Sequence, residues 1–312
     1  MTTDTTDTPL ATATAQVAAA IADPAKRPSI AGFFDEATNT ITYVVHDPAT
    51  CEAAVIDSVL DYDAASGRTS FTSADLVAEY VESKQLKVTL HIETHAHADH
   101  LSAAPYLQGK LGGELGIGRE IIRVQDVFGK LFNAGSEFER DGSQFDRLFV
   151  DGERFKLGEL DGIALHVPGH TPADMAFIIG DAAFVGDTIF MPDFGTARAD
   201  FPGGDAHQLF RSIRRLLALP RDTRLFLCHD YKAPGRDTYA WETTVGQQRD
   251  GNIHVKDGVS EDEFVAMRTT RDATLAMPKL IMPSVQVNIR GGRLPDPEDN
   301  GVSYIKIPIN AV

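Results

Sequence analysis

The stretch Thr94-His95-Ala96-His97-Ala98-Asp99-His100 holds three imidazoles and one carboxylate within six residues. Neutral imidazole is the commonest side-chain metal ligand, and core packing does not explain so dense a cluster. The cluster directly follows the apolar run Lys87–Ile92, which has the composition of a strand. At a strand end, His95 and His97 can approach one cation from the same side, while the residues that follow approach from another. A position in the middle of the chain argues against an engineered tag. The sequence therefore predicts a metal site at the end of a strand.

The composition is that of a globular protein with an acidic surface. The 312 residues are 43% hydrophobic, which is enough for one large α/β domain or two small ones. The formal net charge of -16 repels phosphate backbones, so we expect no nucleic acid partner and no nuclease activity. No run approaches the roughly 20 apolar residues of a membrane helix, so we expect no membrane partner. Two widely separated cysteines, Cys51 and Cys228, make no disulfide framework, which favours a reducing, cytoplasmic setting.

Apolar periodicity divides the chain into interleaved strands and helices, which is typical of the α/β class. We expect strands over Thr40–Val45, Glu52–Asp57, Val88–Glu93, Gly162–Val167, Ala176–Ile179, Ala183–Val185 and Arg224–Cys228. We expect helices over Thr72–Lys84, Leu101–Leu111, His207–Leu219 and Ser260–Met267. The last of these begins with a capping box. The pattern predicts a flexible N-terminal tail over 1–27 with a short helix near Ala15–Ile21, a core over 28–235, and an extension over 236–312 that packs on the core.

Further ligand-type residues stand at the ends of other apolar strands. His170, Asp187 and His229 each follow a short apolar run, and a glycine precedes two of them. Singly, a histidine or aspartate after a strand is more often a turn residue or a helix cap. Together with the histidine cluster, these residues form a set that suits a metal site.

The order and spacing of these motifs resemble the metallo-β-lactamase superfamily. The matching motifs are His95-x-His97-x-Asp99-His100, Pro168-Gly169-His170-Thr171-Pro172, Gly186-Asp187-Thr188 and His229, within the core over 28–235. The resemblance implies an α/β fold, a four-layer αββα sandwich with a C-terminal extension. It also places the metal in a shallow groove at one edge of the two central sheets. Because the superfamily hosts many reactions, the fold does not settle the function.

Two branches of the superfamily compete for this chain. In the glyoxalase II-like branch, two zinc ions lower the pKa of a bound water that attacks a thioester. The resemblance then implies that one ion is held by His95, His97 and His170, the other by Asp99, His100 and His229, with Asp187 as the bridge.

The persulfide dioxygenase branch, to which the ethylmalonic-encephalopathy protein belongs, uses one iron held by two histidines and one aspartate. Carried over, the catalytic metal ligands are His95, His170 and Asp187, with one Fe(II) per chain and Zn or Mn able to substitute. This facial triad is the arrangement of non-haem Fe(II) oxygenases. The remaining side chains would surround the ligands or hold a second metal, namely His97, Asp99, His100 and His229.

Three segments favour the dioxygenase branch by resemblance, namely Phe194–Asp205, Cys228–Tyr231 and Asn252–Met267. We therefore expect a non-haem iron-dependent persulfide dioxygenase that oxidises glutathione persulfide with O₂ to sulfite and glutathione. The first alternative is a dizinc glyoxalase II-like hydrolase of thioesters or lactones. A degenerate fold used only for binding is a third reading, from a different class.

The substrate-binding residues are expected to be Arg198, Tyr231 and Met267. Arg198 can grip a carboxylate in bidentate fashion, and an ion pair with Asp200 or Asp193 is the structural alternative. Tyr231 could hydrogen-bond a peptide or lie half-buried in the core. Resemblance places Met267 in the pocket, although its helical spacing favours core packing. Relatives suggest a homodimer, and any rhodanese partner for sulfur transfer would be a separate protein.

Overall fold

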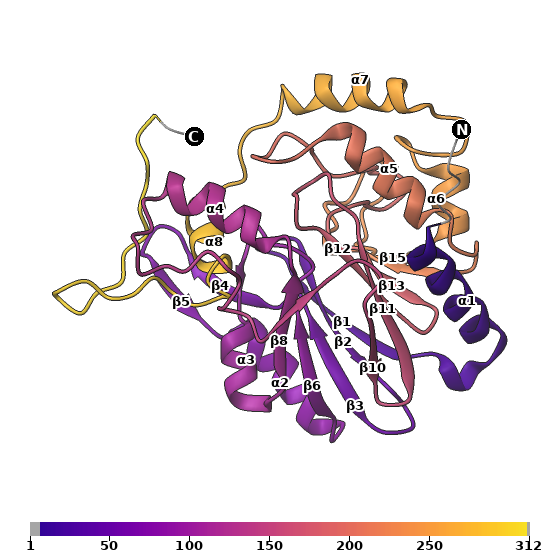
Figure 1. The fold of residues 1–312 in the computed structure, drawn as a ribbon, viewed down its shortest axis with the longest axis horizontal. Coiled ribbons are helices and arrows are strands. Elements are labelled where there is room, and N and C mark those ends of the chain that lie inside the picture. Colours follow the sequence, from indigo (N-terminus) through magenta and orange to yellow (C-terminus); the bar gives the residue numbers. More distant parts are fainter. Residues whose placement is uncertain (1–6, 311–312) are drawn as a thin grey trace.

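The computed structural model describes residues 7–310, in which two six-stranded sheets face each other (Figure 1). In order across the first sheet, the strands are β1 (Ser29–Asp35), β2 (Thr40–His46), β3 (Glu52–Ile56), β6 (Lys87–Ile92), β8 (Glu114–Gly118) and β9 (Arg147–Phe149). In the second sheet, they are β10 (Arg154–Leu157), β11 (Leu160–His166), β12 (Met175–Ile179), β13 (Ala182–Phe184), β14 (Arg224–Phe226) and β15 (Glu242–Thr244). A small third sheet consists of β5 (Arg68–Ser70), β4 (Val59–Asp63) and β7 (Leu101–Ser102).

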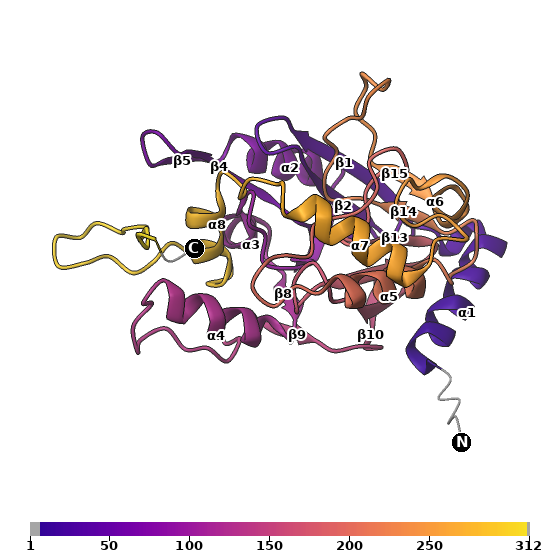
Figure 2. The same ribbon diagram turned by 90° about the horizontal axis from the view of Figure 1, so that it is seen from above.

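The helices cover the outer faces of the two large sheets. They are α1 (Thr8–Ala22), α2 (Thr72–Ser83), α3 (Ala104–Leu111), α4 (Ile121–Leu131), α5 (Ala206–Leu216), α6 (Val245–Gly251), α7 (Glu261–Asp272) and α8 (Ile281–Asn288). A short 3₁₀ turn spans Pro24–Lys26. Figures 1 and 2 show α2 and α3 beside the first sheet, with α5 and α7 adjacent to each other on the other side of the sandwich.

Alternation along the strands creates the layers. In β2, Ile41 and Tyr43 contact the second sheet, whereas Val44 points to the opposite face, where α2 and α3 pack. In β11, Ala164 contacts the first sheet, and its neighbour Ile163 packs with residues of α1 and α5. A sheet with two apolar faces must be covered on both sides, and this confirms the predicted four-layer αββα sandwich.

The first sheet contains both antiparallel and parallel strands, and its parallel part positions residues of the site. β1 pairs with β2 and β2 with β3 in antiparallel fashion, whereas β3, β6, β8 and β9 run parallel to one another. Parallel strands end at the same edge of a sheet, so the loops that follow β3 and β6 lie side by side. Asp57 and the histidine cluster belong to these two loops.

The N-terminal region differs from the predicted flexible tail. Within the described residues, α1 is longer than expected, and its Ala13, Val17 and Ala20 are buried. The Gln16 side chain donates hydrogen bonds to Asp161 O and to a second backbone carbonyl of the same sheet, at 3.0 and 3.2 Å. The tail was misjudged because alanine-rich sequence gives a weak periodic signal. Residues 1–6 of the predicted tail lie outside the described part.

Most other predicted elements match the structure within a few residues. The predicted helix over 101–111 begins only at Ala104, because Leu101 and Ser102 pair with β4. The predicted helix at Ser260 does start with a capping box, and it continues to Asp272. β15 lies in the predicted extension and pairs with β14, so the core and the extension share one sheet.

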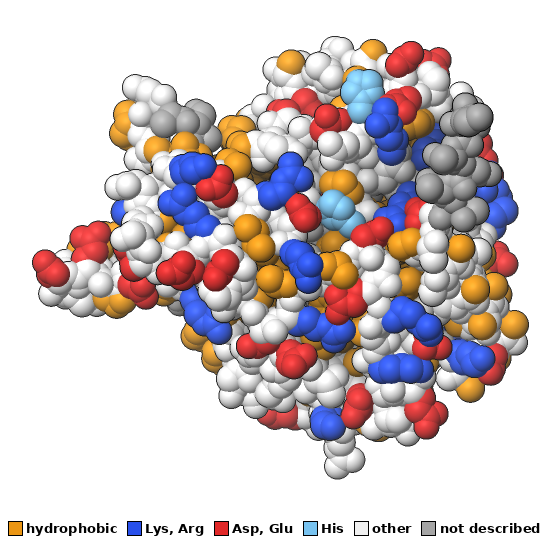
Figure 3. All heavy atoms as spheres, in the orientation of Figure 1, with side chains coloured by type: hydrophobic (Ala, Val, Ile, Leu, Met, Phe, Trp, Pro, Cys, Tyr) orange, Lys and Arg blue, Asp and Glu red, His pale blue; other side chains and the backbone are white. Residues whose placement is uncertain are grey.

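The surface carries its charge in mixed form. Figure 3 shows Lys and Arg side chains next to Asp and Glu side chains over the face of Figure 1. Exposed ion pairs of the described chain include Arg221–Asp250 and Arg249–Asp257. Among residues 7–310, none of the helices combines the length and the apolar character that crossing a bilayer would require.

Candidate metal centre

The predicted ligand residues converge at one edge of the sandwich. The cluster that follows β6 comes from the first sheet. The second sheet supplies the others through the loops after β11, β13 and β14, which carry His170, Asp187 and His229. The two sheets are joined here, because Ile41 N donates to Cys228 O at 2.8 Å. The fold thus brings together residues that are far apart in the sequence.

One group of possible ligands contains His95, His170 and Asp187, all buried. One oxygen of Asp187, Oδ2, lies 3.6 Å from His170 Nε2 and 3.9 Å from His95 Nε2. One ligand atom from each residue lies within 4.8 Å of the others. This spacing is suited to three ligands around a single cation.

A second group lies beside the first and contains His97, Asp99, His100 and His229. His229 Nε2 is 2.9 Å from Asp99 Oδ2 and 3.3 Å from Asp187 Oδ1. The two oxygens of Asp187 therefore face different groups, Oδ2 toward the first and Oδ1 toward the second. A carboxylate in this position can contact two cations at once.

Several buried polar atoms of the two groups accept or donate no hydrogen bond within the described chain. Those without any hydrogen bond include His95 Nε2, His97 Nδ1, Asp99 Oδ1, His100 Nε2, Asp187 Oδ1 and His229 Nε2. Leaving one such atom unsatisfied costs about 1–3 kcal/mol, so a cluster of them needs an explanation. Cations placed among the ligand atoms would supply partners that the chain does not, and the donor set therefore fits metal ions.

The pKa values divide four of the histidines into two pairs. Burial among other histidines holds the pKa of His95 well below its usual range and lowers that of His100 to about 4. Burial also disfavours the charged forms of His97 and His229, but nearby carboxylates outweigh it and raise their pKa values to about 9 and about 10. Metal binding at neutral pH must therefore displace protons from these two rings.

Hydrogen bonds fix the orientation of several rings. Asp57 accepts bonds from His97 Nε2 at 2.9 Å, from Thr94 N at 2.8 Å and from Thr94 Oγ1 at 2.9 Å. His170 Nδ1 donates to Arg198 O at 2.8 Å. Such contacts select the ring nitrogen that faces the metal. Asp57 was not among the predicted site residues, although a carboxylate at the end of a strand was an available signal.

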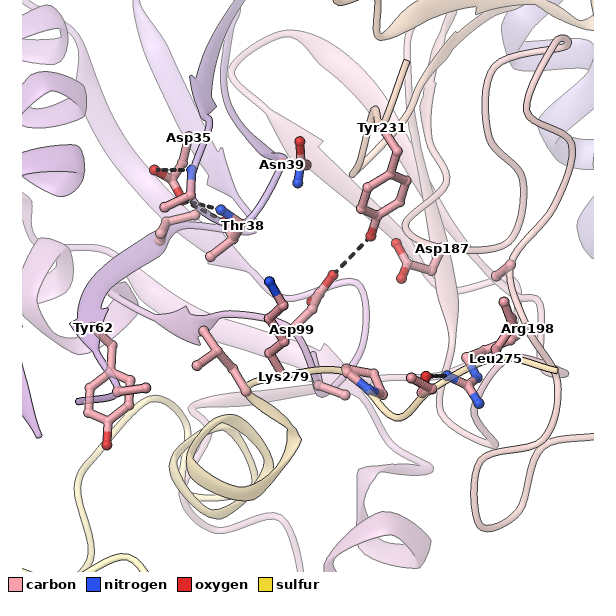
Figure 4. Close-up of a pocket in the computed structure, with 18 of the residues that line it drawn as sticks. Asp35, Thr38, Asn39, Tyr62, Asp99, Asp187, Arg198, Tyr231, Leu275 and Lys279 are labelled. Carbon is pink, nitrogen blue, oxygen red and sulfur yellow. Dashed lines mark hydrogen bonds between the residues drawn. The ribbon is translucent and has the colours of Figure 1, made fainter. Parts of the chain in front are cut away.

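A groove of about 1030 Å³ opens onto the metal centre. Figure 4 shows Tyr231 above Asp99 and Asp187, with Arg198, Leu275 and Lys279 along the wall. The Tyr231 hydroxyl donates to Asp99 Oδ2 at 3.4 Å. The aromatic residues that line the groove are Tyr62, Phe190, Phe194, Phe201 and Tyr231.

The structure separates the three predicted substrate-binding residues. Arg198 lines the groove, but its guanidinium is bound to Asp200 at 2.6 and 2.8 Å and to Ala276 O at 2.8 Å, which is the structural alternative. Tyr231 lines the groove with 40% of its surface exposed, so it is not a core residue. Met267 packs against the hydrophobic core and does not line the groove. The substrate-binding roles stay predictions, and the placement of Met267 does not favour its role.

Several cationic residues of the groove were not predicted from the sequence. Arg68, Arg271 and Lys279 line the groove, and none of the three forms an ion pair with another residue of 7–310. Buried Arg268 lines it too. These cations lie on a hairpin and on the extension, and nothing in their local sequence indicates that they approach the metal ligands.

A sequence profile of the metallo-beta-lactamase superfamily matches residues 39–229, which contain every predicted ligand. The chain belongs to the metallo-beta-lactamase superfamily. A solved structure described as ETHE1 from Myxococcus xanthus is similar, with a TM-score of 0.67, 27% identity, and coverage of 85% of this chain and 100% of that chain. The predicted fold and family are thus confirmed, and a metal-binding cluster is part of the fold.

Relatives with higher identity carry other names. A probable metallo-hydrolase of Burkholderia pseudomallei is 57% identical over 91% of this chain and its own full length. Glyoxylase B2 of Dictyostelium discoideum is 48% identical over 86% of this chain and 92% of that protein. A beta-lactamase hydrolase-like protein of Agrobacterium fabrum is 51% identical, and the match covers 91% of this chain but only 65% of that protein.

The prediction that this chain is an iron-dependent persulfide dioxygenase is wrong. The human persulfide dioxygenase ETHE1 is 28% identical over 83% of the chain, far below the relatives named as hydrolase and glyoxylase. Resemblance to that branch is thus real but distant. The structure supplies a physical reason for the error. A single ion on His95, His170 and Asp187 would leave the unpartnered atoms of the second group buried and unsatisfied.

Proposed function

We propose that this chain is a dinuclear metal-dependent hydrolase that cleaves thioesters or lactones. The position of Asp187 between the two groups of ligand-type residues is the observation that carries the proposal. The names of the relatives with 57% and 48% identity support it. In this proposal, the first ion would be held by His95, His97 and His170, the second by Asp99, His100 and His229, with Asp187 between them. The geometry groups His97 with the second set, but its ring centroid lies 4.1 Å from that of His95 and 4.2 Å from that of His100, so the ring adjoins both ions and is assigned to the first.

Zinc is the metal that we assign to this centre. Imidazole and carboxylate donors suit zinc, iron and manganese alike, so the donor set alone does not choose among them. Hydrolysis needs no redox change, and zinc satisfies this requirement. When bound, the ions would lower the pKa of a water molecule and polarise the substrate carbonyl.

The side chains of the groove would position the substrate. Phe190, Phe194 and Phe201 form an apolar wall that excludes water from the reacting group. The Tyr231 hydroxyl, already directed at Asp99, can turn to donate a hydrogen bond to a bound substrate. A groove of about 1030 Å³ accommodates a substrate much larger than its acyl group alone.

The unpaired cations of the groove favour an anionic substrate. Arg68, Arg271 and Lys279 line it in a chain whose net charge is -16. Local cations attract a carboxylate despite the overall charge, because field lines concentrate in a cleft. We therefore infer a thioester or lactone that carries at least one carboxylate away from the reacting carbonyl. A homodimer stays a prediction.

Metal content and hydrolysis together test the proposal. We expect about two zinc ions per chain by elemental analysis, and zinc-dependent hydrolysis of an anionic thioester such as a glutathione thioester. Asp187→Asn should lower both metal content and turnover. Asp193→Asn is the matched control, because Asp193 pairs with Arg236 at 2.6 Å and does not belong to the ligand groups. One ion per chain at saturating zinc, or no hydrolysis by the two-zinc form, would overturn the proposal.

A further inference from the structure

The loop of the histidine cluster is held by a residue from the C-terminal extension. Asn288, at the end of α8, is buried and donates two hydrogen bonds from Nδ2, to His97 O and to His100 O, both at 2.8 Å. Its Oδ1 accepts a bond from Ser102 N at 2.9 Å. All three of these hydrogen bonds of the amide go to residues 97–102. The amide therefore fixes the backbone at two residues that carry ligand side chains.

A buried ion pair on α7 holds a second loop. Arg268 Nε donates to Asp272 Oδ1 at 2.9 Å, and the two side chains are 1% and 6% exposed. Arg268 Nη1 donates to Thr196 O at 3.1 Å, and Asp272 Oδ2 accepts from Ala199 N at 2.9 Å. The pair thus contacts the backbone on both sides of Arg198.

The same loop orients a predicted metal ligand. Between the two points that the ion pair holds, Arg198 O accepts the hydrogen bond from His170 Nδ1 at 2.8 Å. This bond determines which nitrogen of the His170 ring faces Asp187. A loop that shifts by a fraction of an ångström would therefore turn the ring away from the metal.

We propose that the C-terminal extension positions the metal ligands through these two contacts, Asn288 on the histidine cluster and the Arg268–Asp272 pair on the loop behind His170. The three residues are positioning residues, since none of them belongs to either group of ligand-type residues. The inference rests on the proposed dinuclear centre. It goes beyond the family match, which ends at residue 229 and includes none of them.

The competing explanation is that these contacts only attach the extension to the core and stabilise the fold. A buried ion pair is a poor source of stability, because the cost of removing both charges from water offsets their attraction. An apolar pair would join α7 to the core at least as well. The ion pair offers a donor to Thr196 O and an acceptor to Ala199 N, and the Asn288 amide offers two donors to the carbonyls of His97 and His100, none of which an apolar side chain can supply.

The two contacts predict different metal-binding defects. Asp272→Asn is nearly isosteric and should weaken the ion held by His170 by about 10- to 100-fold while leaving the other ion unchanged. Asn288→Ala should weaken both ions, because His97 and His100 belong to different ions in the proposed assignment. Arg268→Lys keeps the charge opposite Asp272 but has one nitrogen in place of the separate nitrogens that contact Asp272 and Thr196 O, so its effect should be intermediate.

The experiment is a zinc titration of the metal-free full chain in competition with a chromophoric chelator, which yields two dissociation constants. Arg249→Ala is the control, because its ion pair with Asp257 at 2.9 Å lies on the same extension without contacting a ligand loop. Thermal unfolding of each metal-free variant establishes that it is folded. If Asp272→Asn does not fold, Arg268→Lys takes its place in the test of the ion pair.

The outcomes separate the two levels of the proposal. Equal weakening of both ions by Asp272→Asn, or constants like those of Arg249→Ala in all three variants, would overturn the positioning role. A wild-type chain that binds a single ion contradicts the dinuclear function instead. In that case Asp272→Asn must still weaken the one ion if it is held by His170, so the positioning role remains under test.

Discussion

Replacing Asp57 by asparagine should weaken metal binding without removing any metal ligand. Asp57 is 2% exposed, and its carboxylate accepts three hydrogen bonds, one from the His97 ring and two from Thr94. Asparagine keeps the shape, but its NH₂ group must face a donor. At least one hydrogen bond is lost, at a cost of about 1–3 kcal/mol in the free energy of unfolding.

The larger consequence of Asp57→Asn concerns the metal. His97 loses the negative charge that makes its ring a stronger ligand, and mutation of such a partner lowers metal affinity by about 10- to 100-fold, or about 1.4–2.7 kcal/mol. The assay is zinc titration against a chelator, combined with denaturant unfolding of the metal-free protein.

Asp47→Asn provides the matched control for this prediction. Asp47 is 1% exposed and accepts bonds from Ala49 N, Thr50 Oγ1 and Glu159 N at 2.8–2.9 Å. It lies in the turn between β2 and β3, at the opposite end of that hairpin from Asp57. The control should lose comparable stability and keep its zinc affinity. Equal zinc affinities in the two variants would refute the role assigned to Asp57.

Three further predictions follow from other parts of the structure. Gly169 has φ of 144°, and a Cβ there would lie 2.2 Å from Leu209 N. Gly169→Ala should therefore lower the unfolding free energy by about 3 kcal/mol and reduce zinc retention at His170, and an unchanged melting curve would contradict this. Lys279→Ala should raise KM for an anionic thioester by about 2- to 5-fold, with a smaller effect at high salt, whereas Lys256→Ala should not. Burial, next to Arg268 and Arg271, lowers the pKa of His254 to about 4. Because this folded-state pKa lies below the unfolded value of about 6.5, neutral His254 contributes fully to the unfolding free energy above pH 6.5, and this contribution of at most about 3 kcal/mol is lost as the pH falls through 4. Unfolding experiments on His254→Asn should therefore show a smaller fall in unfolding free energy over this pH range.

The predicted ligands were accessible from the sequence because their signal is local. Two patterns can be recognised without any knowledge of the fold: the spacing of histidines after an apolar run, and a single His or Asp at the end of each later strand. The supporting residues give no such signal. Asn288 lies 191 positions from His97, and only the packing of α8 against β7 brings them together.

The error in function has a different origin. The side chains shared by the two branches are the same, so the motifs cannot state how many ions they hold. That number depends on where the two oxygens of Asp187 point, which is a property of the loop after β13 and of the opposing sheet. The N-terminal helix was underestimated for another reason, since its burial depends on alanines that fit against the second sheet.

The origin of the ligands in both sheets has a consequence for the life of the protein in a cell. In the proposed assignment, each ion joins a loop of the first sheet to loops of the second and so acts as a cross-link between the halves of the sandwich. Free zinc at 1,000 times its dissociation constant would add about 4.1 kcal/mol to the unfolding free energy for each site. Zinc starvation would therefore expose the chain to proteolysis before it limited turnover, and the abundance of the protein would follow the supply of the metal.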